Sequence, residues 1–385
     1  MKPRLFLSLF AALILIIPFG ISVGVASADT ACDPAFVNQV GDEIIVSPTG
    51  VDDTANLQCA FDEAPPEATV RLLPGTFYTN QIVVHDFHGR FMGAGDSLTT
   101  IVNLPQMYVA PLIDEKIPPS ADEPWPVLIS FIGGDISVYD LAIHIAGDEP
   151  TTLWKVDPAG SGTTRLLSAV VIFGFGEVNV EISEISMSGE FVDHPKYMIN
   201  LALGVLAYGR PEGHIGSFHV LRSNFTAITG AIDMMYFTNT DVLISHNRFY
   251  GDVIGTWVER FTDSNFVFSH NSLNGGIGLW IATPVPGEDT GNSYLVKNNT
   301  FEVDWGIIID TNYGEGNQCL LLGNNVQTTV ELGIGLGATV HGCTVVGGST
   351  KTNVWDEGYD NILVGVNNMG TGVGPTIQEM LKPMR

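Results

Sequence analysis

Apolar and polar residues alternate in a short phrase that recurs along this chain. Its clearest copy, residues 242–249, reads Val-Leu-Ile-Ser-His-Asn-Arg-Phe, with Val242, Ile244 and Phe249 around the turn residues. Alternation of β-branched and aromatic residues with polar ones predicts strands rather than helices. Further copies begin at residues 266, 295, 321 and 364, and degenerate copies begin at residues 136, 180, 218 and 344.

The copies follow one another at nearly constant spacing. An alignment on one turn position places Asn247, Asn271, Asn299, Asn325, Gly348 and Asn368 in register, with spacings of 24, 28, 26, 23 and 20 residues. Periods of this size indicate a solenoid, and about 24 residues at about 3.3 Å each make one coil of three short strands. We therefore predict one domain over residues 29–385 with about ten coils. Asparagines at a shared turn tolerate a left-handed backbone and can stack in a hydrogen-bonded ladder, so we interpret them as structural.

The N-terminal part carries a more specific signal. Residues 51–58 read Val-Asp-Asp-Thr-Ala-Asn-Leu-Gln, residues 70–78 read Val-Arg-Leu-Leu-Pro-Gly-Thr-Phe-Tyr, and residues 91–101 continue with Phe-Met-Gly-Ala-Gly and Thr-Thr-Ile. Together with the repeat, they resemble the pectin-lyase-like superfamily over residues 42–370. The resemblance implies an all-β, right-handed parallel β-helix. It also implies a short N-terminal helix, capped by Asp53 or Thr54, that plugs the end of the coil.

Three segments interrupt the repeat, near residues 105–126, 148–164 and 188–200. The first two are rich in proline or acidic residues, and the third contains Asp-His-Pro-Lys-Tyr at 193–197. Insertions in a solenoid usually gather on the binding side. We therefore expect loops over one flank of the coil.

Composition and charge exclude several classes of function. Of 385 residues 45% are hydrophobic, which excludes intrinsic disorder. Acidic residues outnumber basic ones by 42 to 16. Without residues 1–28, which contain Lys2 and Arg4, the formal net charge is 14 − 42 = −28. Nucleic-acid binding needs clustered Lys and Arg, so it is excluded, and anionic lipid surfaces are disfavoured.

Residues 1–28 have the order of a secretory signal peptide. Lys2 and Arg4 precede an apolar run that ends before Ala26-Ser27-Ala28, an A-x-A cleavage site. The alternatives are an uncleaved anchor, against which Pro18 and Gly20 interrupt the apolar run, and lipid attachment at Cys32, against which Asp29 stands where such sites want an aliphatic residue. We expect a secreted or periplasmic protein without a membrane segment after cleavage.

Four cysteines follow, and an exported chain with four allows three disulfide pairings. The local choice joins Cys32 to Cys59 and Cys319 to Cys343. The second pair is separated by 24 residues, one repeat. Coils about 4.8 Å apart bring such a pair within the Cα range of a disulfide, so we predict that bond. The chain has no C-x-x-C spacing, so no zinc site is predicted.

Members of the superfamily are mostly secreted polysaccharide lyases, hydrolases and epimerases, beside phage tailspikes, and their substrate usually lies along one outer strand face. In the strands that follow each asparagine turn, alternation points five polar or aromatic side chains outward. These are Asp233, Trp257, Glu259, Trp280 and Asp310. Stacked tryptophans suit sugar binding, so we predict a glycan groove here, flanked by Tyr208 and Arg210.

Glu259 and Asp310 occupy equivalent positions two coils apart, or about 9.6 Å. Inverting glycosidases hold their carboxylates about 6.5–9.5 Å apart. The first hypothesis is therefore an exported polysaccharide hydrolase that uses these carboxylates, with Asp233 as a further candidate.

Two alternatives stay open. Superfamily lyases use Arg or Lys as the base and acidic calcium ligands, which points to Lys196, Tyr208 and Arg210, with Tyr197, His194 and His214 nearby. In that lyase or epimerase, calcium would be the cofactor and would bridge a polyanionic substrate to this negative chain. The third reading is a non-catalytic glycan-binding or surface protein.

Overall fold

The computed structural model describes residues 32–104, 127–146, 168–189, 203–226, 230–282, 289–309, 315–328, 332–348 and 352–368. The predicted signal peptide lies outside these ranges. So do the predicted insertions, except that Ser188 and Gly189 close strand β10 (Ser186–Gly189). No helix among the described residues is long and apolar enough to cross a membrane.

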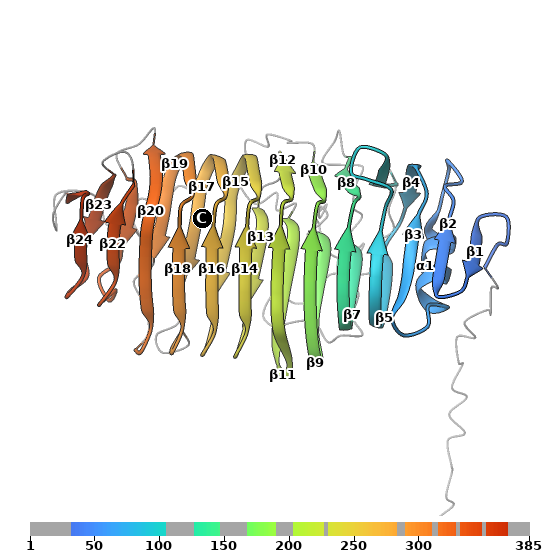
Figure 1. Ribbon diagram of the computed structural model, residues 1–385, viewed down its shortest axis with the longest axis horizontal. Helices are drawn as coiled ribbons and strands as arrows, with labels where there is room; N and C mark the ends of the chain where they lie inside the picture. The colour runs from blue at the N-terminus through green and yellow to red at the C-terminus, as the bar shows by residue number, and fades with distance from the viewer. Residues whose placement is uncertain are drawn as a thin grey trace, which may run out of the picture. The chain divides into compact units, whose positions relative to one another are not determined.

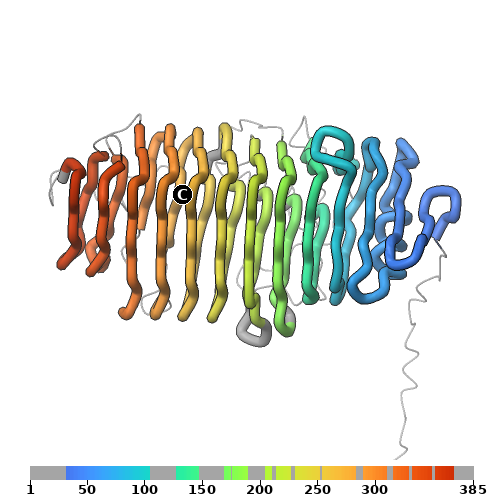
Figure 2. The backbone as a smooth tube through the Cα atoms, viewed as in Figure 1, coloured from blue at the N-terminus to red at the C-terminus, as the bar shows by residue number. Residues whose placement is uncertain are grey.

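The described residues from Cys32 onward form a parallel β-helix, as predicted. Successive coils lie side by side in chain order, from blue to red (Figures 1 and 2). Each coil contributes strands to parallel ladders on three faces, which we call A, B and C. The exception is β1 (Val37–Val40), which pairs antiparallel with β2 (Glu43–Val46) at the N-terminal end.

Face A contains β2, β3 (Ala68–Leu72), β14 (Asp241–Ser245), β16 (Asn265–Ser269), β18 (Ser293–Lys297), β20 (Gln318–Thr328), β22 (Thr344–Gly347) and β24 (Ile362–Val364). The second halves of four long strands, which are described below, lie between β3 and β14 on the same face. Face B contains β4 (Gly75–Thr79), β6 (Thr99–Asn103), β8 (Ala142–Ile145), β10 and β12 (Asn224–Thr226). Face C contains β13 (Gly230–Met235), β21 (Ile334–Leu336), β23 (Asn353–Asp356) and β25 (Asn367–Asn368).

Long strands turn the corners between faces. The strands β5 (Ile82–Met92), β7 (Val127–Tyr139), β9 (Ser168–Ser183) and β11 (Leu203–Leu221) run from face C to face A. The strands β15 (Arg248–Glu259), β17 (Ser272–Ala282) and β19 (Thr300–Ile309) run from face B to face C. The second half of β20 extends face B.

Inward side chains fill the coil because every second strand residue is apolar. Phe225 stacks on Phe249 of the next coil at 5.2 Å, and Phe237 stacks on Phe261 at 4.9 Å. At the N-terminal end, helix α1 (Thr54–Asp62) buries Leu57 and Phe61 against this core. The helix therefore plugs the coil as expected.

The predicted capping role of Asp53 or Thr54 is wrong. Asp53 occupies the N-cap position, but its side chain makes no capping hydrogen bond. Its buried carboxylate instead accepts from the backbone N–H groups of Thr49 and Tyr78, at 2.6 and 2.9 Å. Thr54 Oγ1 accepts from the N–H of Asn80 at 2.8 Å. Both side chains tie the helix to neighbouring strands.

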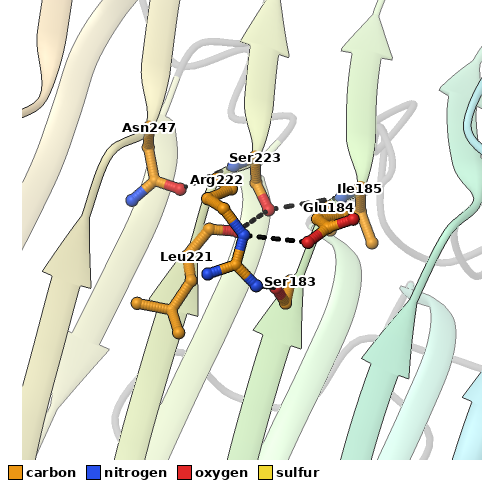
Figure 3. Close-up of polar contacts among 7 residues, drawn as sticks. All are labelled: Ser183, Glu184, Ile185, Leu221, Arg222, Ser223 and Asn247. Atoms are coloured by element: carbon orange, nitrogen blue, oxygen red, sulfur yellow. Dashed lines mark hydrogen bonds and ion pairs between the residues drawn. The ribbon is translucent and has the colours of Figure 1, made fainter.

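The predicted asparagine ladder runs along the corner between faces A and B. The Oδ1 atom of Asn247 accepts from the N–H of Ser223 at 2.9 Å (Figure 3). Asn271 and Asn299 continue the ladder, each accepting from the backbone N–H of the asparagine one coil earlier. The residue before each rung has a left-handed backbone, with φ of 60° at His246 and 56° at His270. Here the asparagines are structural, as interpreted from the sequence.

Further along, the sequence alignment slips by one residue. Asn324, not Asn325, receives the N–H of Asn299, at 3.1 Å. The left-handed corner position falls on Gly323, with φ of 64°, and the ladder residue must follow it. Gly347 then pairs with Asn324, so Gly348 was also misaligned, and Asn368 lies on face C. Spacing alone could not choose between the two asparagines of the Asn324-Asn325 pair.

Both predicted disulfides are present. Cys32 is bonded to Cys59, which ties the chain before β1 to helix α1. Cys319 is bonded to Cys343 of the next coil, with the two Cα atoms 4.5 Å apart. The spacing of one repeat places these two cysteines side by side on neighbouring coils.

Candidate functional site

The register of face C brings several predicted site residues into one row. Asp233 on β13 pairs with Trp257 on β15, which pairs with Trp280 on β17. Their strand neighbours Met234 and Val258 point into the core, because side chains alternate along a strand. The row therefore lies on the outer side of face C. Glu259 stands two residues beyond Trp257, one coil from Asp233, and points to the same side.

Asp233 is buried although it faces away from the core. The residue is 6% exposed, and its Oδ1 atom has no hydrogen-bond partner among the described residues. Burial, and secondarily the charge of Glu259, raise the pKa of Asp233 to about 8. A carboxyl with this pKa is protonated at neutral pH and can donate a hydrogen bond or a proton.

Glu259 has a different environment. Its Oε1 atom lies 3.3 Å from Nε of the adjacent Arg260. That guanidinium lies over the ring of Tyr236, 4.6 Å from its centroid, and Tyr236 packs against Tyr208 at 5.1 Å. A neighbouring cation favours the ionised form of a carboxyl group. Both carboxyl groups are buried, but their neighbours differ, since Glu259 has an adjacent cation whereas Asp233 has the carboxylate of Glu259 beside it.

The tryptophan pair has a defined geometry. The rings of Trp257 and Trp280 are stacked, with centroids 5.0 Å apart and planes inclined by 10°. Because the rings face one another, they do not form two coplanar platforms for successive sugars. Each Nε1 atom is buried without a hydrogen-bond partner among the described residues. Trp280 also packs against the cluster of Ile277 and Ile308, so a ligand would meet the ring edges.

Some predicted residues are not brought together here. Asp310 and Lys196 lie outside the described residues, as do His194 and Tyr197, and the side chain of Arg210 is not described. Tyr208 lies on the outer side of face C, in register with Met235 on β13. The backbone of His214 pairs with that of Glu177 on β9, in the turn from face C to face A.

Sequence reasoning missed two members of the site, Arg260 and Tyr236. Both have left-handed backbones, with φ of 58° and 60°, at the corner where face C ends. At this corner the Arg260 guanidinium lies over the Tyr236 ring of the preceding coil. The sequence did contain one sign of this arrangement, because Arg260 directly follows Glu259. Among the described residues, no group of three or more His, Cys, Asp or Glu side chains could hold a metal ion.

Comparisons with known proteins give a distant likeness only. No protein-family model matches the chain, and no curated protein matches it. Solved structures similar to it include a polygalacturonase from Erwinia carotovora ssp. carotovora, with 10% sequence identity and a TM-score of 0.43, covering 91% of this chain and 98% of that one. A pectin methylesterase in complex with a hexasaccharide has 13% identity and a TM-score of 0.39, covering 72% and 90%. A mannuronan C-5 epimerase A-module from Azotobacter vinelandii has 12% identity and a TM-score of 0.32, covering 85% and 97%.

Proposed function

We propose that this protein is an exported polysaccharide hydrolase whose site lies on the outer side of face C. The observation that carries the proposal is the pair of Asp233 and Glu259. Asp233 is buried with its pKa raised to about 8, whereas Glu259 lies beside Arg260. Glycosidases use two carboxyl groups whose environments separate an acid from a base or nucleophile.

In this reaction Asp233 donates its proton to the glycosidic oxygen as the bond from that oxygen to the anomeric carbon breaks. Glu259, held by Arg260, either takes a proton from the attacking water or attacks the anomeric carbon itself. Trp257 and Trp280 contact the sugar through their ring edges. Asp310 remains a candidate partner of Glu259 on the strength of its equivalent position in the sequence repeat.

The test is a screen of the mature protein on neutral and uronate polysaccharides, with and without calcium. We expect new reducing ends without the ultraviolet absorbance of unsaturated uronates. Absorbance of that kind would contradict hydrolysis and indicate the calcium-assisted lyase instead. Binding without any product would indicate a non-catalytic glycan-binding protein.

Variants then locate the site. Asp233→Asn and Glu259→Gln should each lower the rate at least 100-fold, since general acid–base catalysis contributes about 10²–10⁴. Retained binding of the polysaccharide would show that the fold survives. Glu302→Gln is the matched control, because Glu302 is exposed on face B, away from the site. Asp310→Asn decides whether Asp310 or Asp233 is the acid. Full activity in both Asp233→Asn and Glu259→Gln would place the chemistry on another face.

A further inference from the structure

The outer side of face A changes character along the molecule. One column of outward side chains passes through every coil of this face, one residue per strand. Its N-terminal half contains Thr69, Arg90, Ser137, Glu181 and His219, and its C-terminal half contains Leu243, Val267, Leu295, Leu320, Thr344 and Ile362. The polar half needs no cover, whereas the other half is almost wholly aliphatic.

The aliphatic half is most exposed at its end. Leu320 and Leu322 on β20 are 37% and 38% exposed, and Ile362 and Val364 on β24 are 58% and 50% exposed. We call these four residues the C-terminal patch. They lie on the two sides of β22, which pairs with both strands and places Thr344 and Val346 between them. An exposed apolar surface of this kind is typical of a site that another segment or partner covers.

The sequence after the last described residue suits this surface. Residues 369–385 follow β25 directly and contain four large apolar residues, Ile377, Met380, Leu381 and Met384. Burying such side chains against another apolar surface is favourable.

The chain length allows the contact. In the earlier coils the chain passes from face C to face A, as between β23 and β24. Seven residues, 369–375, span at most about 25 Å when extended. The patch extends over the last three coils of face A, or about 10 Å.

We propose that residues 369–385 dock on the C-terminal patch through their apolar side chains. This contact is independent of the proposed hydrolytic function. It covers aliphatic side chains beside β24, which has no further neighbour beyond β22 among the described strands. Such an edge would otherwise invite pairing with other chains.

A double-mutant cycle in the full chain tests this contact. Leu322→Ser in the patch and Leu381→Ser in the segment should each lower the melting temperature by about 2–4 °C. The double variant should fall no further than the larger single effect, because each change removes the same contact. Additive shifts would overturn the proposal.

Matched controls keep the test specific. Leu98→Ser changes a leucine that is 55% exposed in the N-terminal half, and Gln378→Ser changes a polar residue of the same segment. Both should combine additively with the test variants. In a chain ending at Asn368, amide hydrogen exchange should rise in β20, β22 and β24 and stay unchanged in β14 to β16. Unchanged exchange in all of these strands would contradict the proposal. A dimer of the parent protein that is lost in Leu322→Ser, as measured by sedimentation, would also contradict it and would indicate that a second copy of the chain covers the patch.

Discussion

Asp233 is the residue at which burial and charge conflict most strongly in the described structure. Its pKa rises from the ordinary 3.8 to about 8 on folding, chiefly because it is buried. Between these values the unfolded chain has lost the proton while the folded chain keeps it. Folding stability therefore falls as pH rises through that window, because the native state binds more protons than the unfolded state.

Replacement by asparagine should remove this dependence. Near pH 3, below both pKa values, the Asp233→Asn variant and the parent should melt at similar temperatures, since the parent's carboxyl group is then mostly protonated in the folded and the unfolded chain. Near pH 8 the variant should melt several degrees higher, because only the parent's unfolded state gains from ionisation. Thermal unfolding followed by circular dichroism at both pH values measures the difference. A constant offset between the two proteins across this range would show that Asp233 titrates normally.

At the scale of the element, the asparagine ladder holds one corner of the coil together. Asn271 accepts from Asn247 N–H at 2.9 Å and donates to the carbonyl of Ile244 at 2.9 Å. It also donates to Asn299 Oδ1 at 3.1 Å. All of these atoms are buried, so each rung satisfies backbone groups of its neighbour that water cannot reach.

Removing one rung should therefore be costly. In Asn271→Ala, the N–H of Asn247 and the carbonyl of Ile244 lose their side-chain partner, at about 1–3 kcal/mol for each unpaired group. Urea unfolding should show this loss. Asn274→Ala is the control, because Asn274 is exposed on face B of the same coil. Equal effects of the two changes would mean that the ladder does not stabilise the corner.

The strands and the ladder were predictable because they depend on a local period that the sequence repeats. The slip from Asn324 to Asn325 arose because a one-residue choice depends on the left-handed corner at Gly323, which spacing does not reveal. In the site, the alternation of side chains along each strand was enough to predict that Trp257 and Asp233 point away from the core. The approach of Arg260 to Glu259 and the burial of Asp233 depend on the corner and on neighbouring coils, so the sequence alone could not supply them.

At the scale of the whole molecule, charge limits which polysaccharide can approach. The chain carries a formal net charge of −26, while the described site contains one cation, Arg260, paired with Glu259. A polyuronate would be repelled over distances comparable with the Debye length, about 10 Å at 0.1 M salt and about 3 Å at 1 M. A neutral glycan would feel no such force.

We therefore expect opposite salt responses for the two substrate classes. Added sodium chloride should strengthen binding of a polyuronate several-fold by screening the repulsion, and should leave binding of a neutral glycan unchanged. Affinity measured for both polymers at low and high salt, without calcium, tests this. Polyuronate binding that weakens with salt would show that local cations outweigh the net charge. In that case the site would be attractive to polyanions, and Arg260→Met should abolish the salt response.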